Sequence, residues 1–572
     1  MPRAQPKSSP RPKSSLTDDH ARRIARAIAK GRPPPLDDDL EEYCACSPHE
    51  IFAAFAGAAR HMPPAGKDEA LAHGYLFLLQ RMLEHLRYRT DRGYDDAAKL
   101  IADFQAGVVA RVEVGEVDGR MLALVGGALH QSKIPASPEL TTASAEYLAN
   151  HAAGPGAGRD EGGSLPADIR EPLSRILEDC GRDPFMVVGS LLESGHAAPV
   201  EIRGAVAAAL ALAGIPDARS AAVLFLLDPD SQVRCAVAGV LDEVASELTP
   251  TDVRRLIAVR NWRPEHECPH VDAVIRKARA ASIAGIQWDT GGVESIAATA
   301  VDGAMAQGFL LASPAGRKKR LSSVLTKGGI ADAWSGAPEP RRRVEASLAG
   351  AEMDFPVLAV SRAYLDRAVA HHLALTIKKG EAPPPGLLHV AETVGGDGWQ
   401  PKRMDFGEAL AGLIAEIPKA MREPAELASV LRQSGELADI EAIEESWFED
   451  DPEIREAVAG ARGSRREKLA SYLLQTVIAR RRDRWAEIVL RTALWMREAP
   501  PEDDLCWREL ALVAQALSDG RDMTEIGLMR EVALRTIAVH WSAEPMLSER
   551  DRAHIRLALS ELPAAVVIGA RR

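Results

Sequence analysis

Aromatic residues account for only 5% of this 572-residue chain, and its six cysteines are scattered along it. A shortage of aromatic residues favours helices packed through Ala, Leu and Val over aromatic-rich sheets. Six dispersed cysteines in so long a chain do not have the spacing of a disulfide framework, so we expect a reducing, cytoplasmic location. No apolar run approaches the roughly 20 residues that cross a bilayer, and we therefore expect no membrane span.

The chain also lacks the short motifs of the familiar enzyme classes. There is no G-x-S-x-G elbow, no P-loop, no H-E-x-x-H helix and no kinase motif set. His266, Cys268 and His270 are metal-ligating residue types, but nothing nearby supplies a fourth ligand, so we interpret them as part of a loop between helices. We expect a non-catalytic protein with no cofactor and no resident metal, and an enzyme of unrecognised type is the alternative.

Helix starts recur along the chain with one chemistry, a capping Ser, Thr or Asp followed by Pro. The side-chain oxygen accepts a hydrogen bond from an unpaired amide of the first turn, and the fixed φ of proline suits the first helical position. Segments with the alternation of a strand are almost absent, and residues 112–117 are the nearest example. We therefore predict an all-α fold. The six helix starts are Ser47-Pro48, Ser137-Pro138, Asp183-Pro184, Asp228-Pro229, Thr249-Pro250 and Asp451-Pro452.

An internal repeat is the most informative feature of the sequence. Residues 202–210 and 233–241 match in Arg, Ala, Val, Ala and Leu at an offset of 31 residues, and residues 451–460 repeat part of the same wording. One pair of such helices cannot cover its own apolar stripe, so a period of this length predicts stacked units. The repeat positions are Ile202, Arg203, Leu210, Asp228, Pro229, Val233, Arg234, Leu241, Asp451, Pro452, Ile454 and Arg455.

These repeat positions resemble HEAT-type helical repeats, whose units combine a capping Asp, often with Pro, a Val-Arg pair, small residues and a Leu. The resemblance implies paired antiparallel helices stacked into an α-solenoid. Independently of it, Val233, Val237 and Leu241 form one apolar helical stripe. Arg203 and Arg234 occupy equivalent positions, and we predict that they pair with carboxylates of adjacent units, with the aspartates at 228 and 230 as candidates.

Changes in composition divide the chain into six parts. Pro-, Gly- and base-rich stretches mark the boundaries. We predict a basic disordered tail with a short amphipathic helix at 1–35, an N-terminal helical domain at 36–152, a Gly-rich linker at 153–167, a HEAT-like repeat region at 168–312, a basic linker or loop at 313–345, and a C-terminal helical region of degenerate repeats at 346–572.

The formal net charge of -12 would repel a polyanion if it were evenly spread, so nucleic-acid binding requires local basic patches. Residues 1–32 hold nine basic and two acidic residues, and residues 317–343 hold eight basic and two acidic ones. A solvated tail or loop is the alternative interpretation of each patch. Trp334 is the only aromatic residue in the second patch, which argues against stacking of single-stranded bases. The candidate polyanion-binding residues are Arg22, Arg23, Arg26, Lys30, Arg317, Lys318, Lys319, Arg320, Arg341, Arg342 and Arg343.

The repeat and the missing catalytic motifs together favour a scaffold for protein–protein interaction. The sequence does not identify the protein partner. The alternative is a nucleic-acid-associated helical-repeat protein that uses the N-terminal tail and residues 317–343.

Overall fold

The computed structural model describes residues 15–30, 34–35, 37–62, 68–91, 94–152, 167–195, 198–286, 292–354, 356–396, 399–444, 446–450, 452–461, 465–500 and 506–542. The predicted tail up to residue 14, nearly all of the predicted Gly-rich linker and Asp451 lie outside these residues. The chain divides into two compact units: residues 1–159, 190–199 and 544–572 belong to unit 1, and residues 160–189 and 200–543 belong to unit 2.

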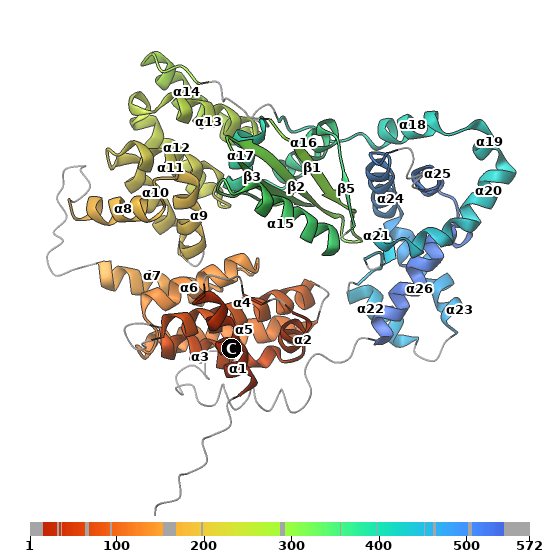
Figure 1. Ribbon diagram of the computed structural model, residues 1–572, viewed down its shortest axis with the longest axis horizontal. Coiled ribbons are helices and arrows are strands. Elements are labelled where there is room, and N and C mark those ends of the chain that lie inside the picture. The colour runs from red at the N-terminus through yellow and green to blue at the C-terminus, as the bar shows by residue number, and fades with distance from the viewer. Residues whose placement is uncertain are drawn as a thin grey trace, which may run out of the picture. The chain divides into compact units, whose positions relative to one another are not determined.

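The first segment of unit 1, up to residue 159, contains seven α-helices among the described residues. They are α1 (Leu16–Ile28), α2 (Asp38–Cys46), α3 (Ile51–His61), α4 (Glu69–Asp91), α5 (Asp95–Glu113), α6 (Gly119–Gln131) and α7 (Pro138–Ala152) (Figure 1). The long helix α4 packs against α1, α3, α5 and α6, so it forms the centre of the unit.

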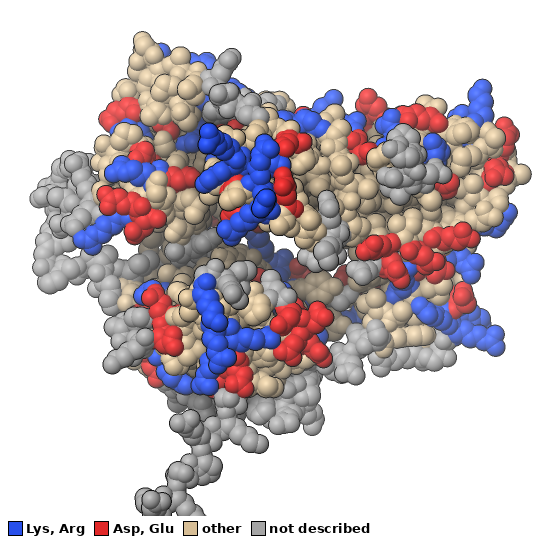
Figure 2. All heavy atoms as spheres, in the orientation of Figure 1, with Lys and Arg blue, Asp and Glu red and all other residues tan. Residues whose placement is uncertain are grey.

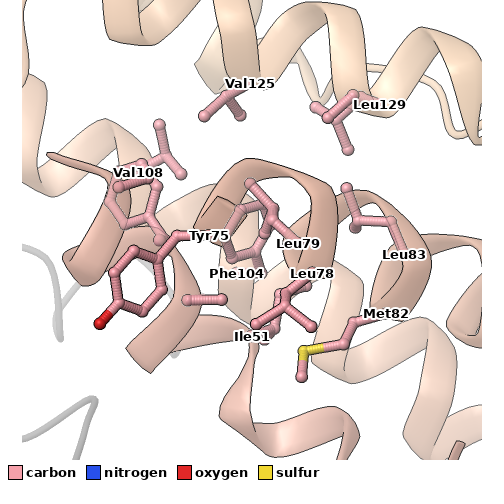
Figure 3. Packing of buried hydrophobic residues seen from close by; sticks show 14 of the residues in the cluster. Ile51, Tyr75, Leu78, Leu79, Met82, Leu83, Phe104, Val108, Val125 and Leu129 are labelled. Atoms are coloured by element: carbon pink, nitrogen blue, oxygen red, sulfur yellow. The ribbon is translucent and has the colours of Figure 1, made fainter. Parts of the chain in front are cut away.

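The core of unit 1 is built on the apolar stripe of α4. Leu79, Leu83 and Leu86 recur at helical spacing and are fully buried. Figure 3 shows Leu129 of α6 facing this stripe, and Phe104 of α5 belongs to the same buried cluster. Because Tyr75 and Phe104 fill this core, they are not available to line a binding groove, whereas Tyr88 of α4 is exposed.

The repeat helices belong mainly to unit 2. They are α8 (Ala167–Asp179), α9 (Pro184–Gly195), α10 (Val200–Leu212), α11 (Pro216–Leu224), α12 (Ser231–Glu243), α13 (Pro250–Asn261) and α14 (Cys268–Ala280), and α9 crosses the division between the units. Helix α12 packs against both α10 and α14, and α11 packs against α13. Helices α10 to α14 therefore form two layers of alternating helices.

The predicted helix starts are correct at some positions and wrong at others. Thr249 caps α13 in a complete capping box, because its Oγ1 accepts a bond from the Asp252 amide at 3.2 Å and its own amide donates to Asp252 Oδ2 at 2.9 Å. At the Asp228-Pro229 site the helix begins later, at Ser231, and Asp230 provides the cap. The carboxylate of Asp228 instead accepts hydrogen bonds from Arg203.

An antiparallel sheet follows the repeat helices, so the predicted all-α fold is wrong for this part of the chain. Its strands are β1 (Ser295–Thr299), β2 (Ala306–Ala315), β3 (Lys318–Lys327), β4 (Ile330–Ser335) and β5 (Val357–Ala359), in the order β4-β3-β2-β1-β5. The repeat region therefore ends before residue 295, earlier than the predicted 312. The predicted basic linker at 313–345 instead forms the end of β2, the strands β3 and β4, and the start of helix α15 (Arg341–Asp354).

The strands escaped detection because polar residues lie on their buried face. Ser322 and Thr326 of β3 are completely buried, whereas Leu325, which lies between them in the strand, is exposed. The hydroxyl groups are satisfied internally: Ser322 pairs with Ser335 at 2.8 Å, and Thr326 donates to the carbonyl of Gln307 at 3.0 Å. The alternation of apolar and polar residues in β3 therefore runs opposite to the usual pattern of a half-buried strand.

The two faces of the sheet are covered unequally. Helices α16 (Arg362–Lys378) and α17 (Pro385–Val394) pack on β3 and β4. Gln307 and Phe309 of the neighbouring strand β2 contact Tyr364 of α16. Helix α15 contacts β3 on the other side, where Lys319 forms an ion pair with Glu345. This second face is only partly covered, and we call it the open face.

The remaining helices of unit 2 follow the sheet in the sequence. They are α18 (Phe406–Glu416), α19 (Lys419–Arg422), α20 (Pro424–Gln433), α21 (Glu441–Glu444), α22 (Pro452–Gly460), α23 (Arg466–Gln475), α24 (Arg482–Met496), α25 (Trp507–Ser518) and α26 (Gly527–Ser542). Two buried indoles connect them to the sheet region: Trp447 donates to the carbonyl of Val301 at 3.0 Å, and Trp495 donates to that of Ala298 at 2.9 Å. No helix in the described residues is long and apolar enough to cross a membrane.

Candidate binding surfaces

The basic N-terminal helix α1 is part of the packed core of unit 1. Ala21, Ile24 and Ala25 are buried where α1 packs against α4. The helix begins at Leu16, and Ser15 provides its cap, accepting a bond from the Asp18 amide at 3.1 Å. The alternative that this helix packs onto the first domain is therefore correct, and α1 is not a detached basic arm.

The candidate cations of α1 differ in their availability. Arg23 makes a two-pronged ion pair with Asp37, at 2.9 and 3.0 Å, which uses its charge internally. Arg22, Arg26 and Lys30 are exposed. They remain candidates for binding a polyanion, on unit 1.

The second group of candidate cations gathers on the sheet because of one backbone interaction. Lys319 and Glu339 form an isolated antiparallel bridge, with N–H···O distances of 3.0 and 2.8 Å. This bridge places the turn between β2 and β3 beside the start of α15, although the two are separated in sequence. Figure 2 shows Lys and Arg side chains gathered over the region of β3 and α15. We call the set Arg317, Lys318, Arg341, Arg342 and Arg343 the basic surface.

Two of the predicted candidates are used inside the fold. Lys319 is almost completely buried, and its Nζ lies 3.0 Å from the carboxylates of both Glu294 and Glu345, which raises its pKa. Arg320 donates to Nε2 of His389 at 2.8 Å. Lys319 therefore serves the fold, and one donor of Arg320 is engaged by His389. That these two side chains form part of a polyanion site stays a prediction.

A polar pocket of about 390 Å³ surrounds His389, between α9, the β2–β3 turn and α17. The imidazole stacks on Phe185 with ring centroids 4.3 Å apart, and burial lowers its pKa to about 4. Arg255 pairs with Glu392 at 2.6 Å and lies over the Phe185 ring. Since its charged groups are paired with one another, this pocket is a packing junction.

Arg203 and Arg234 both pair with carboxylates, as predicted, but the partner of Arg234 differs from the predicted one. Arg203 donates to both carboxylate oxygens of Asp228, at 3.1 and 3.2 Å, as predicted. Arg234 pairs with Glu267 instead of an aspartate at 228 or 230. Glu267 lies one repeat further along the chain, and Arg263 also donates to it. These charges are structural.

Residues 266–270 lie at the start of a helix. Helix α14 begins at Cys268, whose thiol lies 3.4 Å from the carbonyl of Arg260. Nearby, Trp262 is buried and donates from its indole to the carbonyl of Trp399 at 2.9 Å, which anchors the segment. Across the described part of the chain, no group of three or more His, Cys, Asp or Glu side chains could hold a metal.

A groove of about 730 Å³ lies in unit 2 between α16, α18 and the end of α24. We call it the α16–α18 groove. Its walls and floor are formed by Arg362, Asp366, Arg367, Ala370, Gly395, Trp399, Gln400, Lys402, Arg403, Met404, Asp405, Glu408, Ala409, Gly412, Leu413, Glu416, Leu494 and Arg497.

Small residues form part of the lining of this groove. They are Ala370 of α16 and Ala409 and Gly412 of α18. A Cβ built on Gly412 would meet nothing within 4 Å. Leu413 and Leu494 provide apolar surface in the same lining. The groove therefore offers an apolar floor with room for inserted side chains.

Some charged side chains of the groove form ion pairs or hydrogen bonds, and others have no such partner in the part of the chain that the structure describes. Asp366 accepts hydrogen bonds from Arg362 at 2.7 Å and from the Trp399 indole at 2.6 Å. On the opposite wall, Arg497 pairs with Glu416 at 3.0 Å. Lys402 and Arg403 have no carboxylate partner among the described residues, whereas most carboxylates of the lining are engaged. The unpaired charge of the loop between α17 and α18 is therefore positive.

Two adjacent buried histidines of α16, His371 and His372, lie next to the lining of the groove. Nδ1 of His371 accepts a hydrogen bond from the Met404 amide at 3.1 Å, so its Nε2 carries the proton that points to Glu487, 3.5 Å away. This contact holds the 399–404 loop against α16. Neither ring nitrogen of the neighbouring His372 has a hydrogen-bond partner in the described residues, and burial lowers its pKa to about 2.

The groove was not predicted from the sequence. Its walls come from residues 362–416 and 494–497, all within the predicted C-terminal helical region at 346–572. Trp399 in a Gly-rich loop was the one available signal, because a buried indole in a loop requires packing partners from elsewhere.

Two family models match parts of this chain. Residues 199–282 are similar to the Y4lR second domain, and residues 407–541 are similar to the Y4lR C-terminal helical domain. The uncharacterized protein y4lR of Sinorhizobium fredii (strain NBRC 101917 / NGR234) is 25% identical over 324 residues, which cover 55% of this chain and 61% of that protein. No solved structure matches. The wall of the groove formed by α18 lies almost entirely within the second matched segment, whereas α16 lies outside both.

Proposed function

We propose that this chain is a non-catalytic interaction protein that holds a segment of a protein partner in the α16–α18 groove. The observation that carries the proposal is a groove of about 730 Å³ whose lining includes the small residues Ala370, Ala409 and Gly412. Its volume falls within the roughly 300–1,000 Å³ typical of ligand sites. An apolar side chain of a partner would fill the floor, and the rim would orient the segment.

A HEAT-like α-solenoid is part of the same proposal. The repeat positions and the two-layer packing of α10 to α14 support it. We also propose a cytoplasmic location, because no two cysteines form a disulfide in the described part of the chain, as a reducing compartment requires.

Site-specific photo-crosslinking tests the groove. A photoreactive amino acid replaces Gly412, whose Cβ direction is open, and a matched variant carries it at Gly239, an exposed helical glycine of α12 with equally open space. Irradiation in lysate of the source cell is expected to give a discrete adduct from position 412 that is absent from position 239. Mass spectrometry then identifies the partner.

A competition experiment shows whether the groove itself is used. Unlabelled wild-type chain is expected to suppress the adduct, whereas the Gly412→Leu variant, in which leucine occupies the groove, is not. Identical adducts from both positions, or equal suppression by the Gly412→Leu variant, would contradict the proposal.

The second candidate function is nucleic-acid association through the basic surface. The observation that favours it is the Lys319–Glu339 bridge, which brings two separated runs of cations together. Each phosphate contact releases counterions, so the affinity for duplex DNA should fall as salt rises, with a slope of about −0.9 per contact in log units. An affinity that does not change with salt would exclude this electrostatic mechanism.

A further inference from the structure

The open face of the sheet carries an exposed aromatic side chain. Trp334 is 44% exposed and Leu325 is 41% exposed. Trp334 pairs with Ser323 in the β3–β4 register, and the next pair, Ser322 and Ser335, points to α17 through Thr393. Because neighbouring residues of a strand point to opposite faces, Trp334 lies on the side of the sheet that α15 covers only in part.

The indole lies close to the basic surface. A Cβ built on Gly336 would be 3.6 Å from the six-membered ring of Trp334, so the ring extends along the chain toward Gly336. The Gly336 amide donates to the carbonyl of Leu321 at 2.9 Å, and the Lys319–Glu339 bridge follows two residues further along β3. Two residues of a strand span about 7 Å. The exposed ring therefore lies on the same side of the sheet as Lys319 and close to the bridge that leads into α15.

The cations of this region are available to a ligand. Arg317, Lys318, Arg341 and Arg342 have no carboxylate partner in the part of the chain that the structure describes, and the two arginines of α15 are exposed. Arg343 differs, since it pairs with Glu339 at 3.1 Å. Three arginines in the first turn of α15 also oppose the helix dipole, which favours anions at that end. A bound anion would relieve this unfavourable arrangement.

We infer that this region binds a single-stranded nucleic acid, with one base stacked on Trp334 and phosphates on Arg317, Lys318, Arg341 and Arg342. The inference rests on the second candidate function and names its ligand. A duplex keeps its bases stacked inside, whereas a single strand offers an exposed base to an indole. An acidic protein surface would meet the same cations but would have no specific use for the exposed ring.

The structure changes the expectation drawn from the sequence on this point. The sequence argued against base stacking because only one aromatic residue, Trp334, lies among the basic residues. It did not show where that residue lies in the fold. The fold exposes that one ring beside the cations, and a single stacked base contributes measurably to affinity.

Fluorescence anisotropy of the full chain tests the inference. The probes are fluorescein-labelled 20-nucleotide oligo(dT) and the same strand annealed to oligo(dA), titrated between 50 and 200 mM salt. Trp334→Leu is expected to weaken binding of the single strand by about 5- to 140-fold and to leave duplex binding unchanged. Tyr472→Leu, which replaces an aromatic residue of α23 that is 53% exposed, is the matched control and should change neither.

A second pair of variants tests the phosphate contacts. Replacement of Arg317, Lys318, Arg341 and Arg342 by Gln is expected to flatten the single-strand salt slope by about 2.8, or about 0.7 for each contact. The control replaces Arg276 and Arg279, exposed cations of α14, by Gln and should leave the slope unchanged.

The outcomes separate the inference from the function on which it rests. If Trp334→Leu binds the single strand as tightly as the wild type while salt-dependent duplex binding persists, the stacking site is wrong and nucleic-acid association stands. If neither probe binds with salt dependence, both are wrong. If vesicles containing phosphatidylserine bind in a manner that depends on Trp334 and the oligonucleotides do not, the ligand is a membrane surface and the inference is overturned.

Discussion

Arg234 of α12 and Glu267, the residue before α14, form a completely buried ion pair in which the side chains are 0% and 1% exposed. Nη2 of the arginine lies 2.6 Å from Oε1 and its Nε lies 3.0 Å from Oε2. The remaining N–H groups donate to the carbonyls of Asp228, Pro229 and Gly380. All five donors of the guanidinium are therefore satisfied, which is what makes its burial tolerable.

Removing the carboxylate of this pair should destabilise unit 2 strongly. Glu267→Ala leaves Arg234 and Arg263 buried without a counter-charge, which typically costs about 3–5 kcal/mol. The matched control is Glu416→Ala, whose pair with Arg497 is 44% and 41% exposed and should contribute at most about 1 kcal/mol. Urea denaturation followed by tryptophan fluorescence measures both, and equal losses of unfolding free energy would contradict the buried role.

Two helical glycines should respond in opposite directions to the same substitution. A Cβ on Gly386 of α17 would overlap the carbonyl oxygen of Ala333 in β4, whereas a Cβ on Gly412 meets nothing within 4 Å. We expect Gly386→Ala to lower the free energy of unfolding by about 1–3 kcal/mol through forced displacement of α17. Gly412→Ala should raise it by about 0.5–1 kcal/mol, because alanine favours the helix. Chemical denaturation would refute this contrast if both variants shifted in the same direction.

The buried His372 should make unit 2 less stable in mild acid. Its pKa is lowered to about 2 by burial, with Arg491, His371 and Lys379 adding positive charge nearby. The unfolded chain takes up a proton below about pH 6.5 that the folded state excludes, so this contribution is complete above that pH and is lost as the pH falls. The free energy of unfolding should decrease by up to about 1.4 kcal/mol per pH unit below the unfolded pKa.

The variant His372→Leu isolates this effect. Leucine cannot take up the proton and leaves no ring nitrogen unsatisfied, so its unfolding free energy should depend less steeply on pH between 6.5 and 5. Denaturation midpoints at pH 7.5, 6.5, 5.5 and 5 give the comparison. Parallel pH profiles for the variant and the wild type would show that His372 does not contribute.

Adjacent lysines at the start of β3 should have separable roles. Lys319 pairs with Glu294 and Glu345, whereas Lys318 is exposed beside the basic surface. We expect Lys319→Gln to lower the denaturation midpoint without changing oligonucleotide affinity. Lys318→Gln should weaken oligonucleotide binding without changing the midpoint. The reverse assignment, found by anisotropy and denaturation on the same samples, would contradict the division into structural and available cations.

Local chemistry allowed some helix starts and one ion pair to be predicted. The capping box at Thr249 depends only on residues three apart, so the sequence contains everything needed to recognise it. The pairing of Arg203 with Asp228 followed from the repeat period, because equivalent positions in stacked units face one another. The correct partner of Arg234 was missed, since Glu267 lies in a turn outside the repeat motif.

The candidate sites were predicted less well than the helices. The list of cations was read from the sequence, but Lys319 and Arg320 are occupied by partners that are distant in the chain. The α16–α18 groove depends on a cavity between α16, α18 and the end of α24, which are far apart in the chain, and no local pattern describes empty space. Ala409 and Gly412 read as ordinary small helical residues until their neighbours are known.

The sequence by itself determined the helix-rich character, some of the helix starts, the repeat and the unequal distribution of charge, because each depends on composition or on residues within a few turns. Only the tertiary structure decided that residues 295–359 contain a sheet, since Ser322 and Thr326 are buried there with hydroxyl partners from other strands and elements. It also decided which cations remain available and where a groove stays open. Those properties depend on pairing and packing between distant segments, whose free energy is not encoded in any short window of residues.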